Sequence, residues 1–166
     1  MYEVGDYIVH PGQGVCRVEE ITAGPAATYQ LLPVAQRHAM RISFPVAGED
    51  RLRPVLSRDE AVRAIDLYPS IEVDDFSAKS SSLEEEHFKA EIRRGSCIDT
   101  MRIVKTFRAR IAEVRSRNKK PPVAYERILK QASERSLAEL AVALDTTVED
   151  VKALLATREG EDLEAN

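Results

Sequence analysis

The sequence predicts an α+β fold with two domains, in which a small rolled antiparallel sheet or β-barrel is followed by an all-α helical domain. Two patterns predict this class. In the first 56 residues, short apolar segments alternate with turns that contain Gly and Pro, as is typical of short strands. From residue 83 onward, apolar residues recur at intervals of three and four, as is typical of amphipathic helices.

A β-hairpin is expected at the start of the chain. Apolar residues at positions 7–9, 15, 16 and 18 flank the sequence His-Pro-Gly-Gln-Gly, whose proline and glycines suit a tight turn. Further short strands are expected at residues 29–34, 40–46 and 52–55. So many short strands in so little chain favour a rolled sheet or barrel, because an open sheet of this size buries too little apolar surface.

A helix is expected at residues 58–68, because Ser57 and Glu60 have the spacing of a capping box and Pro69 ends the apolar pattern. The segment after it is acidic and then serine-rich, with little to pack, which is typical of a linker. We therefore expect three parts: a sheet domain at residues 1–68 that includes this helix, a linker at residues 69–82, and a helical domain at residues 83–166.

The second half of the chain is expected to be helical throughout. The apolar spacing predicts helices at residues 83–94, 98–117 and 125–144, and a final helix that starts with a capping box at Thr146–Glu149. The segment 136–151 has the layout of a helix-turn-helix, but its second helix opens with two acidic residues, which would face the phosphates of DNA. We therefore interpret it as a structural pair of helices.

Positive charge is concentrated in the middle of the chain. Residues 87–131 contain 13 Lys or Arg and 4 Asp or Glu, whereas the whole chain has a formal net charge of −4. Such a block could steer polyanions or be a solvated helical face, and the charge pattern leaves both open. No aromatic residues interleave with the cations of the long helix, so its face would hold phosphates without reading bases. The candidate contacts with a nucleic-acid backbone are Arg93, Arg94, Arg102, Lys105, Arg108, Lys119 and Lys120.

No motif for catalysis is evident. The three histidines share no spacing with cysteines or carboxylates that predicts a metal site, and no nucleophile–base pair is apparent. We therefore expect a protein that is not an enzyme and uses no metal, cofactor or small-molecule substrate. Cys16 and Cys97 match no metal-ligand spacing and are expected to be buried thiols. Because no signal peptide or membrane-spanning pattern is apparent, we expect a cytoplasmic protein without membrane contact.

The expected strand at residues 40–46 could bind another protein. Pro45 donates no backbone hydrogen bond, so this strand should end there or lie at a sheet edge. An edge strand offers unpaired backbone groups to a strand of a partner. The alternative is an edge that Pro45 and Arg41 protect from such pairing.

Several segments, taken in order, carry a family resemblance. The most specific is Val-Gly-Asp-Tyr-Ile-Val-His-Pro-Gly-x-Gly-Val at residues 4–15. Weaker matches follow at residues 44–46 (Phe-Pro-Val), 52–57 (Leu-Arg-Pro-Val-Leu-Ser) and 139–141 (Glu-Leu-Ala). In this order of parts the chain resembles the CarD-like family of bacterial RNA polymerase-binding proteins.

The resemblance implies a Tudor-like sheet domain that binds the β subunit of RNA polymerase by strand addition, and a helical domain that lies on promoter DNA. The residues that match the contact strand of the family are Met40, Arg41, Ile42, Ser43 and Phe44. The family commonly has a tryptophan wedge that is followed by cations, whereas this chain contains no tryptophan. The matching position is Ser81, and Glu84 and Glu86 lie nearby, so the usual wedge between base pairs is missing.

Together these patterns predict a transcription regulator whose sheet domain binds RNA polymerase and whose helical domain lies near promoter DNA. The alternative is an adaptor on RNA polymerase whose helical domain binds a protein partner rather than DNA.

Overall fold

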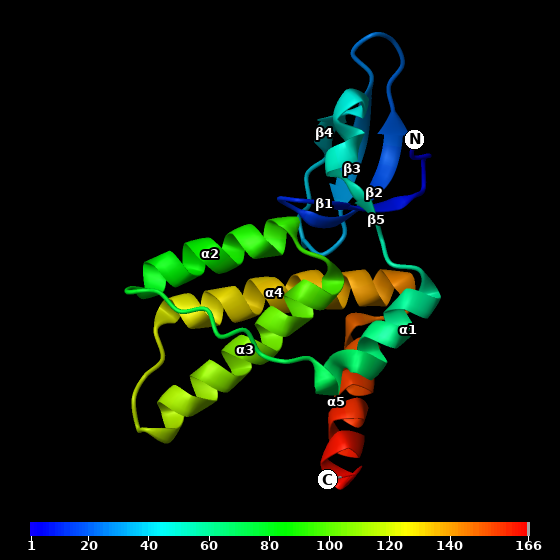
Figure 1. The fold of residues 1–166 in the computed structure, drawn as a ribbon. Coiled ribbons are helices and arrows are strands. Elements are labelled where there is room, and N and C mark those ends of the chain that lie inside the picture. Colours follow the sequence, from blue (N-terminus) through cyan, green and yellow to red (C-terminus); the bar gives the residue numbers. More distant parts are fainter. Residues whose placement is uncertain (166) are drawn as a thin grey trace.

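The computed structural model describes residues 1–165, and side chains are described for residues 1–160, so Asn166 at the end of the expected helical domain lies outside the described residues. The chain forms a β body at its N-terminal end and a helical body that ends in the C-terminal helix (Figure 1). This arrangement confirms the predicted α+β class with two domains. No helix among the described residues is long and apolar enough to span a membrane.

The β body is one antiparallel sheet of five short strands. Its strand order is β4-β3-β2-β1-β5, so β4 and β5 form its two edges. A 3-10 segment, η1 (Val46–Arg51), connects these two edge strands. The strands are β1 (Tyr7–His10), β2 (Gly14–Ile21), β3 (Thr28–Pro33), β4 (Ile42–Pro45) and β5 (Arg53–Pro54).

The turn between β1 and β2 is stabilised by one histidine and one glycine. The Nδ1 atom of His10 accepts hydrogen bonds from the backbone N–H groups of Gly12 and Gln13, at 3.0 and 3.1 Å. Gly14 has a φ of +77°, a backbone conformation that other residues adopt at a cost. The hairpin therefore forms at the position that the sequence predicts.

The helical body contains five α-helices. Ser57 and Glu60 form the predicted capping box, with backbone hydrogen bonds of 3.1 and 3.0 Å. The last helix starts one residue later than expected, because Thr147 rather than Thr146 accepts the capping hydrogen bond, which comes from Asp150. The helices are α1 (Arg58–Leu67), α2 (Ser81–Arg94), α3 (Cys97–Ser116), α4 (Val123–Ala143) and α5 (Val148–Ala165).

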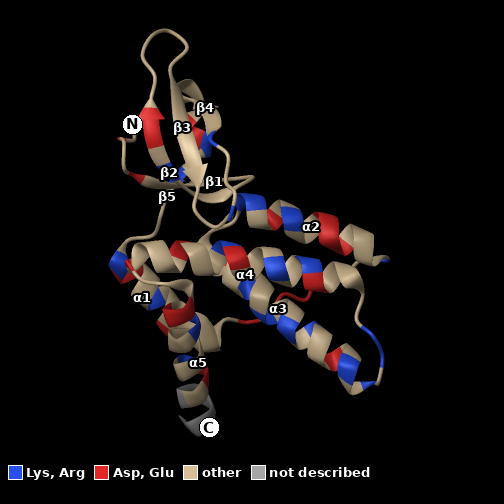
Figure 2. Cartoon of the chain, turned by 180° about the vertical axis from the view of Figure 1, so that it is seen from behind, with Lys and Arg blue, Asp and Glu red and all other residues tan. Residues whose placement is uncertain are grey.

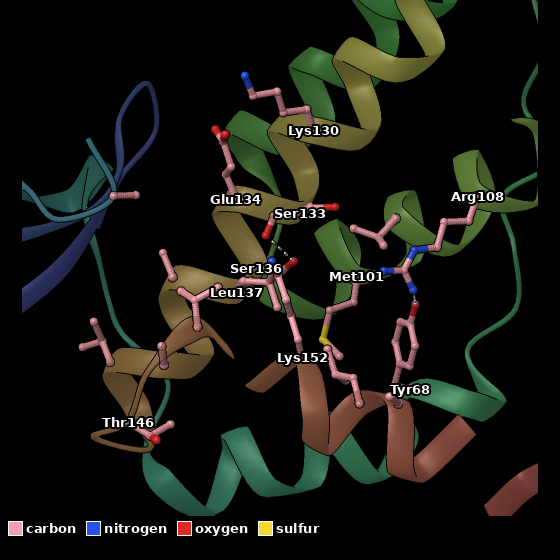
Figure 3. Close-up of a pocket in the computed structure, with 18 of the residues that line it drawn as sticks. Tyr68, Met101, Arg108, Lys130, Ser133, Glu134, Ser136, Leu137, Thr146 and Lys152 are labelled. Atoms are coloured by element: carbon pink, nitrogen blue, oxygen red, sulfur yellow. Dashed lines mark hydrogen bonds between the residues drawn. The ribbon is translucent and has the colours of Figure 1, made fainter. Parts of the chain in front are cut away.

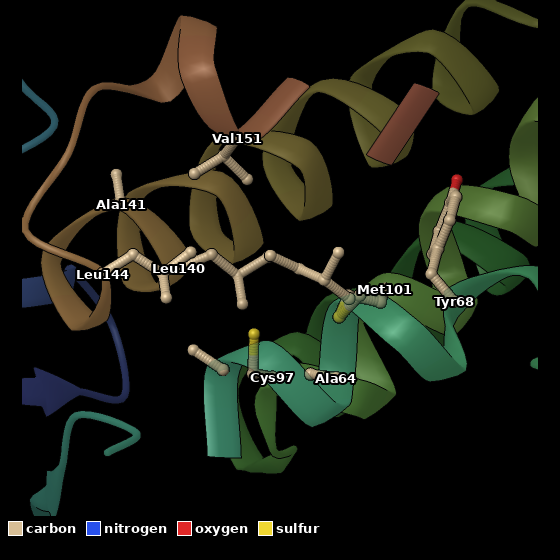
Figure 4. Packing of buried hydrophobic residues seen from close by; sticks show 10 residues of the cluster. Ala64, Tyr68, Cys97, Met101, Leu140, Ala141, Leu144 and Val151 are labelled. Carbon is tan, nitrogen blue, oxygen red and sulfur yellow. The ribbon is translucent and has the colours of Figure 1, made fainter. Parts of the chain in front are cut away.

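Helix α1 lies with the other helices and not on the sheet, which differs from the expected domain boundary at residue 68. Its buried residues Ala64 and Ile65 share one apolar cluster with Met101 of α3, Leu140 of α4 and Val151 of α5 (Figure 4). The small side chains on its inner face let α1 approach α4 and α5 closely. The sheet body therefore ends near residue 56.

The segment at residues 71–80, which we call the strap, differs from the expected linker because it is packed along α3 (Figure 1). The side chain of Thr106 accepts the backbone N–H of Asp74 at 2.8 Å. The guanidinium of Arg110 donates to the backbone carbonyls of Asp74 and Phe76. Composition predicted a solvated chain, but α3 supplies partners for the polar groups of the strap.

The sheet packs directly on α4. Val9 and Val15 of the hairpin contact Ala138 of α4 in a small buried cluster. Arg53 of β5 donates two hydrogen bonds to the carboxylate of Glu139, at 2.6 and 2.7 Å. The Glu139 side chain is only 3% exposed, so its carboxylate is removed from water, whereas the Arg53 side chain is 34% exposed.

Two further contacts fix the position of the sheet on α4. The carboxylate of Glu139 also accepts the backbone N–H of Leu56, at 3.1 Å. Arg135, one helical turn earlier, donates to the carbonyl of Pro11 in the hairpin turn, at 2.6 Å. A Cβ atom at Gly14 would lie 2.9 Å from the Arg135 side chain, so glycine also permits this close approach.

Candidate functional site

The predicted contact strand lies at one edge of the sheet, and β5 lies at the opposite edge. Residues 42–45 form β4, which pairs only with β3 among the strands of the described chain. Met40 and Arg41 precede the strand in an extended segment and are exposed. The outer side of β4 therefore presents a border to which an additional strand could pair.

Alternate residues of β4 point to opposite faces of the sheet. Phe44 is 7% exposed and belongs to the sheet core, where its ring contacts His10 edge-on at 5.4 Å between ring centres. Ile42 is half-buried beside the same core. Of the five predicted contact residues, Met40, Arg41 and Ser43 are therefore the ones whose side chains a partner could reach.

The outer face beside β4 is polar. Arg41 forms an ion pair with Glu20 of β2 at 3.6 Å, and both side chains are more than half exposed. Ser43 exchanges hydrogen bonds with the amide of Gln30 on β3, at 2.9 and 3.1 Å. Such exposed pairs contribute little to folding stability, so their groups are available to a partner at low cost.

The cations of α3 do not form one open phosphate-binding face. Lys105 donates its three N–H groups to the carbonyls of Tyr68, Pro69 and Ile71, at 3.0, 2.8 and 2.7 Å. An ammonium has three donors, so none of them is left for a phosphate. The sequence predicted Lys105 as a contact with the nucleic-acid backbone. In the structure Lys105 instead lies against the short 3-10 turn η2 (Tyr68–Ser70), which follows α1.

Two other predicted cations of α3 also have partners within the protein. Arg102 pairs with Asp99 at 3.3 Å, one turn earlier on the same helix. Arg108 donates to the hydroxyl of Tyr68 at 3.0 Å and lies 3.8 Å from Glu159. These arginines are partly exposed, but a phosphate would have to compete with the groups that already bind them.

The remaining predicted cations are exposed and lie at the two ends of α3 (Figure 2). Arg93 and Arg94 are the last residues of α2, next to the start of α3. Lys119 and Lys120 lie in the loop that connects α3 to α4. Since α3 has 20 residues, the two pairs are separated by about 30 Å along the helix axis.

Of the two acidic residues near the position of the missing tryptophan, one is turned inward and one is exposed. Ser81 is the first residue of α2, directly after the N-cap residue Ser80. Glu84 is 6% exposed and pairs with Arg110 of α3 at 3.5 Å, so it is not presented to a phosphate. Glu86 is exposed, as expected from the sequence.

A groove of about 860 Å³ lies between α3, α4 and α5, beside the loop after β3 (Figure 3). Its lining is largely apolar and includes Met101, Leu137 and Leu155. No histidine or cysteine is present among the described residues that line it. Arg108 donates to the Tyr68 hydroxyl at this groove, at 3.0 Å.

Both cysteines are free and buried, as the sequence predicts. Burial raises the pKa of the Cys16 thiol to about 12, and burial raises the pKa of Cys97 as well. Neither thiol is therefore suited to act as a nucleophile near neutral pH.

The contacts that join the two bodies have no local signature in the sequence. Arg53 and Glu139 are 86 positions apart in the chain, so no local spacing connects them. A signal was present in the family resemblance, which includes Glu139 without indicating its partner. The strap was missed for a similar reason, because side chains of α3 bind its backbone groups, and backbone groups have no sequence signature.

These features define the class of protein: a small β domain with an open edge that packs on a helical domain. Residues 2–56 match the family model of the CarD-like/TRCF RID domain. The N-terminal domain is therefore similar to this domain family, and the match ends where the sheet body ends. The match to this domain indicates that the protein interacts with RNA polymerase and is associated with transcription. A comparison with curated proteins found no match.

Proposed function

We propose that this chain is a transcription regulator that binds the β subunit of RNA polymerase through the outer edge of β4. The observation that carries the proposal is the position of β4 at the border of a domain whose family interacts with RNA polymerase. Main-chain hydrogen bonds along Arg41–Phe44 supply affinity, and Met40, Arg41 and Ser43 supply side-chain contacts.

A charge reversal at the edge tests this assignment. Arg41→Glu places a negative charge beside Glu20 and next to the proposed partner strand, so we expect binding to core RNA polymerase to weaken about tenfold, which equals about 1.4 kcal/mol. Affinity measured by biolayer interferometry with immobilised polymerase gives the readout. The matched control is Arg63→Glu, an exposed arginine on α1 in the helical domain. Unchanged affinity of Arg41→Glu, or an equal loss in the control, would count against the β4 edge.

We further propose that the helical domain contacts the DNA backbone through Arg93, Arg94, Lys119 and Lys120. The exposure of these four cations and their location at both ends of α3 support this assignment. A duplex that lies along α3 would be contacted at two points about 30 Å apart. Without the tryptophan, such contacts hold DNA without unstacking it.

A second candidate function is an adaptor whose helical domain binds a protein partner. The specific observation in its favour is that Lys105, Arg102 and Arg108 are already bound by groups of the protein itself. The apolar groove between α3, α4 and α5 offers a surface on the same domain that does not depend on phosphate.

The salt dependence of binding to forked promoter DNA distinguishes the two candidates. Four phosphate contacts predict that the logarithm of the affinity falls with the logarithm of salt concentration with a slope of about −3.6. Replacing Lys119 and Lys120 by Gln should reduce this slope by about 2, whereas Lys79→Gln on the strap should leave it unchanged. If the helical domain is instead an adaptor that binds a protein partner, DNA binding should not be measurable at any salt concentration in the titration.

A further inference from the structure

Three potential metal ligands from two separate segments meet where the strap passes α2. His87 and Glu91 lie one turn apart on α2, and Asp74 belongs to the strap. One ligand atom from each residue lies within 4.8 Å of the others. We propose that Asp74, His87 and Glu91 form a binding site for a divalent transition-metal ion, and that Zn²⁺ is the ion that suits it best.

The distance between two of the ligands is already suitable for an ion. The Nε2 atom of His87 lies 3.3 Å from a carboxylate oxygen of Glu91. Two ligands of a tetrahedral Zn²⁺, with bonds of about 2.0–2.1 Å, lie about 3.4 Å apart. Asp74 completes the set after a movement of roughly 1–1.5 Å, which rotation of its carboxylate can supply.

The His87 ring is held in place by aromatic contacts. It stacks on Phe76 of the strap with ring centres 3.6 Å apart and an interplanar angle of 13°. Phe88 contacts the ring edge-on at 4.9 Å. These contacts restrict the rotation of the imidazole, and a restricted ligand loses less conformational entropy when it binds a metal.

Asp74 is held in place by its own backbone. Its N–H donates to the hydroxyl of Thr106 at 2.8 Å, and its carbonyl accepts from Arg110 at 3.2 Å. One carboxylate oxygen accepts the N–H of Phe76 at 2.8 Å, which leaves the other oxygen to bind an ion. The hydrogen bonds that attach the strap to α3 therefore also position the third ligand.

A cleft of about 270 Å³ beside the cluster provides room for water molecules that complete the coordination. Asp74 and Glu91 line this cleft together with Asp99, Arg94 and Arg102. Arg102 pairs with Asp99 at 3.3 Å, which reduces the repulsion between its charge and a cation. One imidazole and two carboxylates are a ligand set that Zn²⁺ accepts, with water in the fourth position.

The test is titration of the full chain with Zn²⁺ after treatment with a chelator. We expect one ion per chain by isothermal titration calorimetry, and a higher midpoint of thermal unfolding with Zn²⁺ present, because binding to the folded state stabilises it. His87→Phe keeps an aromatic ring against Phe76 but removes the nitrogen ligand. Asp74→Asn keeps an oxygen acceptor for the N–H of Phe76. Each variant should lower the affinity for Zn²⁺ at least tenfold.

The matched control is His38→Phe, which removes an exposed histidine in the loop between β3 and β4 and should bind Zn²⁺ as the wild type does. Circular dichroism checks that each variant folds, and Glu91→Gln replaces His87→Phe if that variant does not. Absence of saturable binding, or wild-type affinity in the folded ligand variants, would overturn the site. With Co²⁺ in place of Zn²⁺, a thiolate-to-metal charge-transfer band would show that a cysteine binds the ion. This result would also overturn the proposed site.

Discussion

At the scale of single residues, His10 combines a structural role with a titratable group. Its Nδ1 atom accepts two backbone N–H groups in the hairpin turn, so protonation of this atom removes both hydrogen bonds. Burial lowers the pKa of His10 below its usual 6.5, and the nearby charges of Arg135 and Arg51 lower it further. The folded state therefore holds a neutral His10 at pH values where the unfolded chain is already protonated.

This difference predicts how stability changes with pH. Because the unfolded state binds more protons, the contribution of His10 is fully present above about pH 6.5 and is lost as the pH falls through the lower pKa of the folded state. We expect His10→Asn, which keeps an acceptor near the position of Nδ1, to lose less stability between pH 7.5 and 5.5 than the wild type. Urea unfolding at both pH values measures this, with the exposed His38→Asn as the control. An identical pH dependence in His10→Asn would contradict the prediction.

Some residues could be assigned from local spacing and others could not. Ser57 and Glu60 are three positions apart, and their capping box forms as expected because all of its partners lie within one turn. The cluster of Asp74, His87 and Glu91 was not predicted, because Asp74 lies in a segment whose composition indicated a linker. Lys105 shows the same limit, since its partners are three backbone carbonyls far away in the sequence.

At the scale of elements, the strap and α3 form one unit. Lys105 binds the three carbonyls that end the turn after α1, where the partial negative charge of a helix C-terminus also attracts a cation. Thr106, the next residue of α3, and Arg110, about one turn after Thr106, bind the strap. A large part of the predicted basic face therefore holds the protein's own chain.

Removing the Lys105 ammonium should destabilise the helical domain. Lys105→Met keeps the aliphatic stem but leaves three carbonyls without their donor, so we expect the free energy of unfolding to fall by about 2 kcal/mol. Urea unfolding measures the loss, and hydrogen exchange of the Asp74 and Ile71 amides should become faster. Lys130→Met, at an exposed position of α4, is the matched control. A loss below about 0.5 kcal/mol would show that water replaces the ammonium without cost.

The strands were more predictable than the placement of the elements. Alternating apolar residues and the turn at residues 10–14 located the hairpin, because both are local signals. The capping box located the start of α1 but could not show which body α1 joins. That choice depends on the fit of Ala61, Ala64 and Ile65 against Met101 and Leu140, which is a property of the folded helices.

At the scale of the whole molecule, the contact between the two bodies is built on one buried carboxylate. Glu139 accepts hydrogen bonds from Arg53 and from the backbone of Leu56, so it binds both the sheet and the connection that leaves it. Val9 and Val15 add apolar contact with Ala138 beside this ion pair. The sheet therefore has one position on α4.

Loss of the Glu139 carboxylate should weaken both stability and cooperativity. Glu139→Ala leaves Arg53 partly buried without its partner, and we expect the free energy of unfolding to fall by about 2–3 kcal/mol. This is less than for a fully buried pair, because the Arg53 side chain keeps 34% of its exposure. The two bodies should also begin to unfold separately, which urea unfolding followed by near-ultraviolet circular dichroism can detect. Glu134→Ala, at an exposed position of the same helix, is the control, and a single unchanged transition in Glu139→Ala would contradict the prediction.

The fixed position of the sheet on α4 has a consequence for how partners are selected. If a partner strand pairs with β4 and a second ligand binds the helices, the contacts between the sheet and α4 set the separation and the angle between the two. Two sites whose spacing differs from this value cannot be occupied together, however well each one fits alone. Selectivity of this kind comes from distance and orientation rather than from the identity of any one contact.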